Sequence, residues 1–345
     1  MSSLQVVLAV MVPVWTLSVL ANLAVARPRL RPVAIGAALA FYGLLALGAL
    51  TAVAVVMLGA AGANGAPGAL ALLQRLASAV PVAAACVAVG ALAAALSLHP
   101  VVRRRAARLL PLDPDAIVDA MALSLALCGL GLGSANIALT SVAFDMLESG
   151  RVSVASDVAT SLATNVLVIL PAALLGVGVF IRRRPLDALR RLGFTRTNWW
   201  AVAFAPLVAI AMFMAAILVS VVWTAVDPAS AARITRLNEA VMGDFTALGI
   251  AGSFLIAGVA ALTEETLFRG ALQPKLGIVL PTLLFAVMHA QYLFSPATLL
   301  IFVLGFALAL TRRFSGNIYT PMATHFLYNF IISALAVVMR SLPRP

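Results

Sequence analysis

Residues 34–59 read AIGAALAFYGLLALGALTAVAVVMLG, a run of 26 residues without a charged side chain. An α-helix rises about 1.5 Å per residue, so this run is long enough to cross a hydrocarbon core of roughly 30 Å. Hydrophobic residues make up 63% of the 345-residue chain and charged residues 10%, against roughly 45–50% and 25% in soluble domains. A water-soluble chain could not bury so much apolar surface. The sequence therefore predicts an all-α, polytopic transmembrane helical bundle.

Similar apolar runs recur from one end of the chain to the other. They are centred near residues 5–26, 34–59, 77–98, 117–141, 158–181, 201–226, 247–268, 277–291, 296–311 and 320–339. The eighth and ninth are short for a bilayer. The first is expected to be retained as a span, because its basic residues follow the apolar run. We expect about ten membrane-spanning helices.

Positive charge gathers in alternate connections between these runs. The net charge is +11, and the arginines of these connections are Arg27, Arg29, Arg31, Arg103, Arg104, Arg105, Arg108, Arg182, Arg183, Arg184, Arg190, Arg191, Arg196, Arg312 and Arg313. The positive-inside rule places them in the cytoplasm and both termini outside. In a soluble protein this excess of positive charge would suggest nucleic-acid binding. Here the loops of a membrane protein account for it, so we expect membrane lipid and no nucleic acid as partner.

The chain divides near residue 200. Residues 1–199 are expected to form an N-terminal membrane region of about five spans plus a basic interfacial segment, of unassigned role. The basic residues 182–200, with leucines and tryptophans between the arginines, fit an interfacial helix on anionic lipid or a solvated loop. Gly129 and Gly133 have the small-xxx-small spacing of closely packed helices. Residues 200–339 are expected to be the catalytic membrane core.

Placing one charged side chain within lipid costs about 2.5–3.5 kcal/mol of insertion free energy. The positions of such side chains therefore indicate function. Six stand out at the ends of, or within, three apolar runs: Glu264, Glu265, Arg269, His289, His325 and Asn329. Glu265 and Arg269 are four residues apart, so they share a helix face and can pair. His325 and Asn329 share a face for the same reason. The least costly arrangement gathers these groups into one buried polar pocket.

Three short motifs carry these residues. Residues 264–270, EETLFRG, resemble the EExxxR signature of the CAAX prenyl protease 2-like family, the CPBP intramembrane endopeptidases. Residues 285–289, FAVMH, are similar to the family's FxxxH motif, and residues 325–329, HFLYN, to its HxxxN motif. All three occur in the family's order, each on its own helix. The resemblance covers roughly residues 200–339.

The resemblance implies hydrolysis of a peptide bond within the membrane. Glu264 and His289 would hold and activate a water, and His325 and Asn329 would stabilise the oxyanion. Glu265 and Arg269 would form a structural ion pair. The substrate would be a prenylated tail, a leader peptide or another membrane-bound peptide, and no cofactor would be needed. We expect an integral, multi-pass protein of a bacterial cell membrane.

A zinc site is the main alternative mechanism, with Glu264, His289 and His325 as ligands and one open position. No HExxH motif is present, and no aspartate or glutamate is evidently placed to orient the histidines. Cys86 and Cys128 lie inside apolar runs, which argues against a Cys-ligated metal. We therefore favour the metal-free glutamate mechanism. A transporter with an intramembrane proton path, or a non-enzymatic scaffold that keeps the pocket, is the alternative function.

Overall fold

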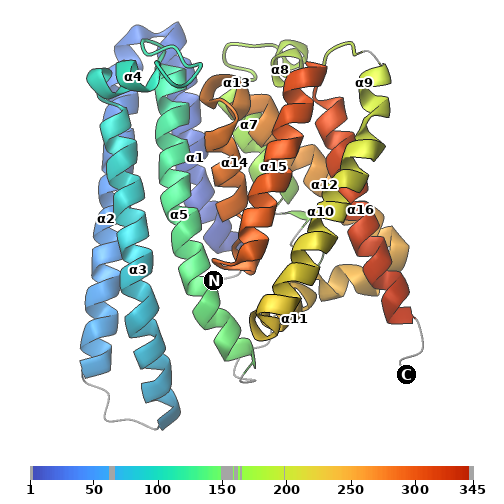
Figure 1. Ribbon diagram of the computed structural model, residues 1–345. Helices are drawn as coiled ribbons and strands as arrows, with labels where there is room; N and C mark the ends of the chain where they lie inside the picture. The colour runs from blue at the N-terminus through green and yellow to red at the C-terminus, as the bar shows by residue number, and fades with distance from the viewer. Residues whose placement is uncertain are drawn as a thin grey trace.

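The computed structural model of the protein is built from helices (Figure 1). It describes residues 3–61, 67–148, 158, 162–163, 165–197 and 199–341. Within these ranges no β-sheet forms, and strand-like pairing is confined to an isolated bridge between Val179 and Arg183. The predicted all-α class is therefore confirmed.

The helices divide between two parts of the chain, called here the first half (up to residue 198) and the second half (from residue 199). Those of the first half are α1 (Ser3–Ala26), η1 (Pro28–Leu30), α2 (Arg31–Ala61), α3 (Pro67–Ser97), α4 (Pro100–Ala106), α5 (Ile117–Glu148), η2 (Asn165–Ile169), α7 (Leu170–Gly176) and α8 (Pro185–Leu192). Those of the second half are α9 (Trp199–Ala203), α10 (Ala205–Val226), α11 (Pro228–Ala247), α12 (Gly249–Glu265), η3 (Thr266–Leu272), α13 (Gln273–Leu276), α14 (Val279–Val287), η4 (Ala290–Tyr292), α15 (Pro296–Ser315) and α16 (Tyr319–Ser341).

Seven helices in the described part of the chain are long and apolar enough to cross a membrane, so the protein is a multi-pass membrane protein. They are Pro28–Ala60, Leu72–Ser97, Ile117–Met146, Trp199–Val226, Gly249–Leu276, Pro296–Ser315 and Tyr319–Ser341. The first and fifth predicted runs contain the shorter apolar helices Met11–Ala26 and Asn165–Gly176. The eighth contains α14, of only nine residues. Helix α1 as a whole spans Ser3–Ala26, and part of the fifth run lies outside the described residues, so the number of about ten spans stays a prediction.

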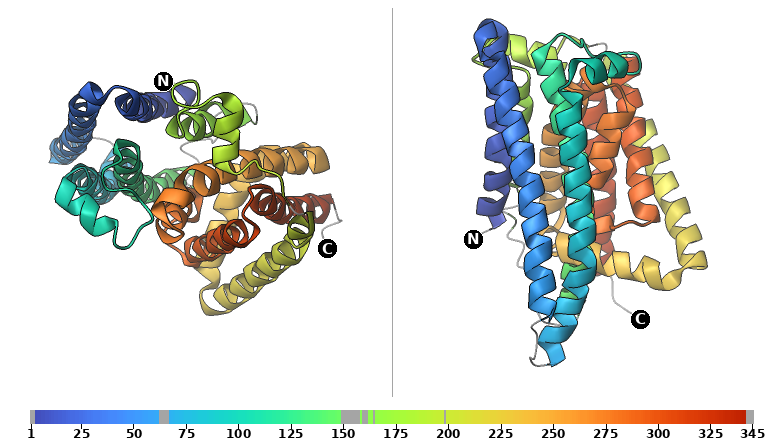
Figure 2. Two further views of the ribbon diagram at one scale, coloured as in Figure 1. Left: turned by 90° about the horizontal axis from the view of Figure 1, so that it is seen from above. Right: turned by 90° about the vertical axis from the view of Figure 1, so that its left-hand side faces the viewer.

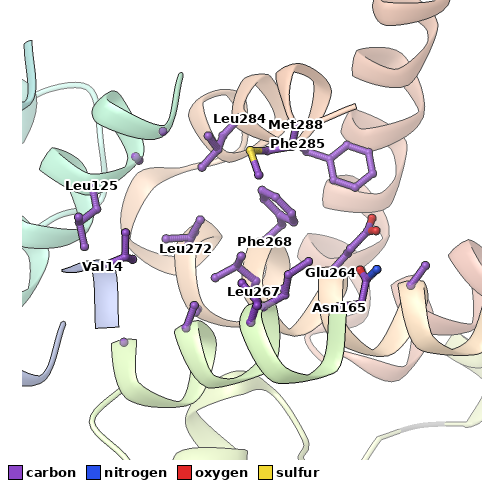
Figure 3. A pocket seen from close by; sticks show the side chains of 18 of the residues that line it. Val14, Leu125, Asn165, Glu264, Leu267, Phe268, Leu272, Leu284, Phe285 and Met288 are labelled. Atoms are coloured by element: carbon purple, nitrogen blue, oxygen red, sulfur yellow. The ribbon is translucent and has the colours of Figure 1, made fainter. Parts of the chain in front are cut away.

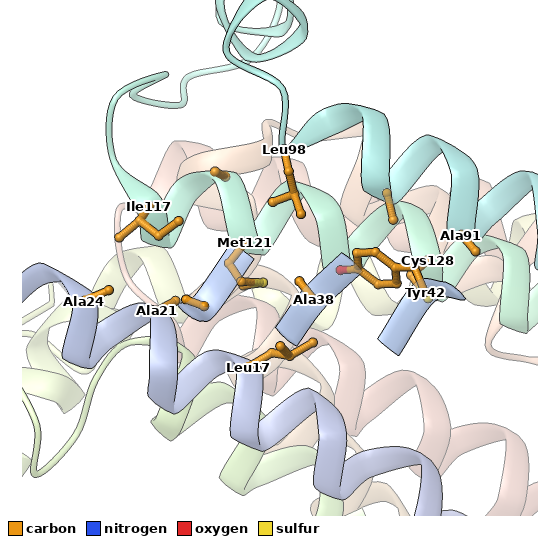
Figure 4. Close-up of a cluster of buried hydrophobic side chains, with 13 residues drawn as sticks. Leu17, Ala21, Ala24, Ala38, Tyr42, Ala91, Leu98, Ile117, Met121 and Cys128 are labelled. Carbon is orange, nitrogen blue, oxygen red and sulfur yellow. The ribbon is translucent and has the colours of Figure 1, made fainter. Parts of the chain in front are cut away.

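Helices α1, α2, α3 and α5 occupy one side of the molecule (Figure 2). Their shared core is made largely of alanine and leucine, with Tyr42 inside it (Figure 4). The Ser124 hydroxyl donates to the Ala94 carbonyl at 2.9 Å and accepts from the Tyr42 hydroxyl at 2.6 Å, which joins three helices. A Cβ on Gly90 would come within 2.7 Å of the Gly131 Cα, so α3 and α5 approach as closely as two backbones can.

The other contact of α5 is with α14, in the second half of the chain. A Cβ on Gly133 would lie 2.7 Å from a Val287 methyl carbon, and one on Gly129 would lie 3.0 Å from a Leu284 methyl carbon. The close packing predicted for these two glycines is confirmed. Through it, the N-terminal region supports the helix that ends next to His289.

The arginine-rich connections lie at one end of the bundle. Helices α4 and α8 and the C-terminal end of α15 share that end, whereas α11 crosses the other (Figure 1). Helix α12 runs from α11 toward α13, so its C-terminal residues lie nearer the basic end. Of the two alternatives for residues 182–200, a helix forms over Pro185–Leu192.

Helix α11 lies between the sixth and seventh predicted runs, where no element was expected. Its buried residues Ala231, Ile234 and Leu237 repeat every three positions and so face the bundle. Arg233 forms an ion pair with Asp145 near the end of α5. A low content of apolar residues hides such a helix from a search for spans.

Candidate active site

Glu264 and Glu265 are the last two residues of α12, where the helix widens into the π-helical turns of η3. Such π-turns are frequent at functional sites. Neighbouring helical residues are rotated by about 100° from each other, so the two carboxylates face different surroundings. Glu264 lines a cavity, whereas Glu265 is fully buried outside it.

The Glu265 carboxylate binds two side chains, the cationic Arg269 and the ionisable His325. Its Oε1 atom accepts from Arg269 Nη1 at 3.0 Å and from His325 Nδ1 at 2.8 Å. The ion pair with Arg269 follows from the i,i+4 spacing, but the contact with His325 joins residues 60 positions apart in the chain. The expectation that no acidic residue orients the histidines is therefore wrong: Glu265 orients His325. Helix packing brings this carboxylate to the imidazole, and nothing in the spacing reveals it.

Arg269 ties two further elements, α15 and α14, to the glutamate pair. Its Nη2 donates to the Gly305 carbonyl on α15 at 2.8 Å. Its guanidinium lies over the Phe285 ring, 4.5 Å from the ring centre, a cation–π contact. A Cβ on Gly305 would come within 2.9 Å of Phe285, so only glycine leaves room for this arrangement. Because the side chain is buried, its charge depends on these partners.

His289 follows α14, and its orientation is set by its own helix. The Nδ1 atom lies 2.8 Å from the Phe285 carbonyl, one turn back. A carbonyl only accepts, so Nδ1 carries the proton and Nε2 of the neutral ring is an acceptor. The ring packs between Phe285, with centroids 4.6 Å apart, and Tyr292, with centroids 6.3 Å apart and planes nearly parallel. The spacing of the FxxxH motif thus has a physical role.

His325 and Asn329 lie one turn apart on α16, and both line the cavity. The contact of His325 Nδ1 with Glu265 leaves Nε2 for other partners. His325 is buried, and its ring meets Phe285 edge to face at 6.1 Å between centroids. The predicted pair therefore presents one imidazole nitrogen and one amide to the same space.

The cavity that these residues share has a volume of about 890 Å³. Glu264, His289, His325 and Asn329 are all among the residues that line it. Glu264 Oε2 is buried and accepts no hydrogen bond from the described residues. Glu265 Oε2 shares that property, but Glu265 does not line the cavity. A carboxylate oxygen at a cavity wall without a partner is placed to bind a polar ligand.

Other polar residues line the cavity and were not predicted, among them Asn165, Tyr292 and Tyr328. Asn165 begins η2 and is drawn beside Glu264 in Figure 3. It belongs to the N-terminal region, whose role the sequence leaves open. A lone asparagine in an apolar run was a signal for this position. Tyr292 follows His289 by three residues, which places it within reach of the same ring.

The alternative zinc site is not supported by the geometry. Among the described residues, which include Glu264, His289 and His325, no three His, Cys, Asp or Glu side chains are grouped so that they could hold a metal ion. The donor set that the zinc alternative requires therefore does not fit, and no step of a mechanism is assigned to a metal.

The fold and the site define a class: a multi-pass helical membrane protein with carboxylate, imidazole and amide groups around one internal cavity. Residues 246–331 match the family described as type II CAAX prenyl endopeptidase Rce1-like. This segment contains all six predicted site residues. The resemblance inferred from the three motifs is therefore confirmed for this part of the chain, which carries a domain of a peptidase family.

One curated relative matches a longer segment. The chain is 28% identical over 172 residues to the uncharacterized protein YpbD of Bacillus subtilis (strain 168). The alignment covers 49% of this chain and 85% of that protein. No solved structure matches the chain. A bacterial protein is therefore similar to about half of this chain.

Proposed function

We propose that the protein is an intramembrane endopeptidase of a bacterial cell membrane. It hydrolyses a peptide bond of a membrane-associated, lipid-modified or leader peptide, without a metal. The convergence of Glu264, His289, His325 and Asn329 on one cavity carries this proposal. The family matched by residues 246–331 supports the same reaction class.

Glu264 and His289 activate the water. The Nε2 atom of His289 accepts one hydrogen bond from it, because Nδ1 is engaged by the Phe285 carbonyl. Glu264 accepts the other proton of the same water as general base. The water oxygen then forms a bond to the carbonyl carbon of the substrate, and its proton moves to the Glu264 carboxylate.

His325 and Asn329 stabilise the negative oxygen that develops on the carbonyl. In its protonated form, His325 donates from Nδ1 to Glu265 and from Nε2 to the oxyanion at the same time. The Asn329 amide supplies a second donor, and preorganised donors of this kind contribute a large part of catalysis. Collapse of the intermediate breaks the C–N bond, and Glu264 returns its proton to the leaving nitrogen.

The test is proteolysis by the purified, reconstituted protein. Wild type and Glu264→Gln are incubated with proteoliposomes carrying a mixed set of membrane and lipid-modified peptides, and new peptide ends are identified by mass spectrometry. Wild type is expected to generate ends that Glu264→Gln does not, because the amide keeps the shape but accepts no proton. Glu239→Gln, at an exposed position on α11, is the matched control and is expected to cleave normally.

The same assay separates the alternatives. Chelators are expected to leave cleavage intact. A stoichiometric transition metal whose removal abolishes activity and whose return restores it would instead make Glu264, His289 and His325 ligands. Absence of cleavage in every peptide mixture, from a folded protein with intact ion gradients across its vesicles, would favour the scaffold. Substrate-free proton flux that depends on Glu264 would favour the transporter.

A further inference from the structure

The cavity extends well beyond the four proposed catalytic residues. From Glu264 it follows η3 and α13, past Leu267, Phe268 and Leu272, to Lys275. Figure 3 shows Val14 of α1 and Leu125 of α5 on the side away from Glu264. Both helices belong to the N-terminal region, which has no assigned role. The walls along this length are mainly apolar.

The length of this apolar part of the cavity is similar to the hydrocarbon thickness of one membrane leaflet. Lys275 lies eleven steps of nearly continuous helix after Glu264, which is at most about 16 Å at the α-helical rise of 1.5 Å per residue. One leaflet contributes about half of a hydrocarbon core of roughly 30 Å. The basic end of this cavity therefore lies at headgroup depth if Glu264 lies near the middle of the membrane.

Three arginines line the cavity at that end: Arg182, Arg183 and Arg191. They make hydrogen bonds to neutral acceptors. Arg182 Nε donates to the Asn22 side-chain oxygen at 2.7 Å, and Arg191 Nη1 donates to the Gly270 carbonyl at 3.3 Å. Arg183 donates to the Val177 carbonyl in the same turn. These bonds orient the guanidinium groups without neutralising them.

Asp119 lines the same cavity and attracts Arg182 and Arg191, so acidic groups balance only part of this charge. Across the described residues, no carboxylate lies within ion-pair distance of the three arginines. The nearby Asp119 accepts from Lys275 at 2.8 Å. Burial, followed by repulsion from Arg183, lowers the pKa of both Arg182 and Arg191. The cluster is thus a concentration of positive charge, exposed at Arg182 and half-buried at Arg183 and Arg191, that an anion would stabilise.

We propose that this cavity holds an anionic phospholipid, with its phosphate on Arg182, Arg183 and Arg191 and an acyl chain along the apolar wall toward Glu264. Guanidinium groups suit phosphate because they bind two of its oxygens at once. The apolar wall favours a lipid over a free phosphate ion, which would leave that surface without a partner. This proposal does not depend on the proteolytic function, because it concerns binding alone.

The first experiment uses the unmodified protein. The full chain, purified in a neutral detergent, is titrated with dioleoyl phosphatidylglycerol or dioleoyl phosphatidylcholine, and bound lipid is counted by native mass spectrometry. The anionic lipid is expected to be retained at least about ten-fold more tightly, the effect of one charge-assisted hydrogen bond. Equal retention of the two lipids would overturn the proposal without any variant being needed.

Variants then locate the site. Arg191→Gln is expected to lower retention of the anionic lipid about ten-fold. The matched control is Arg104→Gln, an exposed arginine on α4 at the same end of the molecule that does not line the cavity. Equal losses in both variants would indicate general attraction to a basic surface and would contradict the site.

Two further arms distinguish a lipid from a free anion. Val14→Trp narrows the apolar wall, so it is expected to weaken binding of dioleoyl phosphatidylglycerol more than that of its dihexanoyl counterpart. Inorganic phosphate is expected to compete poorly with the long-chain lipid. Complete displacement by millimolar phosphate, together with no effect of Val14→Trp, would show an anion site without a lipid and would refute the proposal.

Discussion

At the scale of single residues, Glu264 and Glu265 are neighbours in the chain, but their carboxylates have different surroundings. Glu265 turns away from the cavity and binds Arg269 and His325 through one oxygen. Glu264 turns toward the cavity and keeps one buried oxygen without a partner among the described residues. Helical rotation alone gives two identical side chains different surroundings, so their substitutions should have different consequences.

Asn329→Ala tests the proposed oxyanion donor. We expect kcat to fall by about 10²–10³-fold, the cost of losing one such donor. KM should change little, because the donor acts mainly in the transition state. Ser341→Ala, exposed at the end of α16 and away from the cavity, is the control, since its hydroxyl donates to the Val338 carbonyl. A large rise in KM with unchanged kcat would place Asn329 in substrate binding instead.

Arg269→Ala tests the buried ion pair. Its removal leaves Glu265 buried without its cation, which typically costs about 3–5 kcal/mol of folding free energy. The expected result is a lower Tm and a lower yield of folded protein, measured by thermal unfolding in detergent. Arg313→Ala, exposed at the basic end of α15, should have an unchanged Tm. A folded Arg269→Ala protein with normal Tm and no activity would contradict a structural role.

At the scale of elements, the packing of α5 against α14 links the two halves of the chain. Gly129 and Gly133 face Leu284 and Val287 at distances that leave no room for a side chain. Helix α14 has only nine residues, so its position depends on its neighbours more than on its own hydrogen bonds. His289 follows directly after it.

Gly133→Ala tests this dependence. The added Cβ would lie 2.7 Å from Val287, so α14 must shift. Overpacking of this kind costs about 1–3 kcal/mol, and displacement of His289 should lower kcat as well. Thermal unfolding and the cleavage assay measure the two effects. Gly43→Ala on α2 is the control, because a Cβ there meets nothing within 4 Å. Equal behaviour of the two variants would show that the α5–α14 contact does not position the site.

At the scale of the whole molecule, charge is distributed unevenly along the membrane normal. The arginine-rich segments around α4, α8 and the end of α15 lie at one end, and α11 lies at the other (Figure 1). The positive-inside rule predicts that the basic end faces the cytoplasm. Glu264 and the arginine cluster of the proposed lipid site would then lie in the cytoplasmic half of the bilayer.

Cysteine labelling in intact cells tests this orientation. In a background with Cys86 and Cys128 replaced by serine, single cysteines are introduced as Asp187→Cys on α8 and Glu239→Cys on α11, both exposed positions. A membrane-impermeant maleimide is expected to label position 239 directly and position 187 only after permeabilisation. The reverse pattern would invert the topology.

The positions of the long helices can be read from the sequence, because they follow its apolar runs. In lipid a backbone must satisfy its hydrogen bonds within the segment, so long apolar runs become helices. The pairing of Glu265 with Arg269 and of His289 with the Phe285 carbonyl also follows from i,i+4 geometry on one helix. Three motifs in order were enough to predict the peptidase family that residues 246–331 match.

The partners in most contacts between helices were decided by the tertiary structure. His325 reaches Glu265 across 60 residues, and Asn165 joins the cavity from the N-terminal region. Helix α11 likewise depends on its neighbours, against which Ala231, Ile234 and Leu237 are buried. Such contacts depend on which helix faces pack together, and no spacing within one helix determines that. For this protein, the sequence predicted which residues carry the chemistry, and helix packing decided which of them meet.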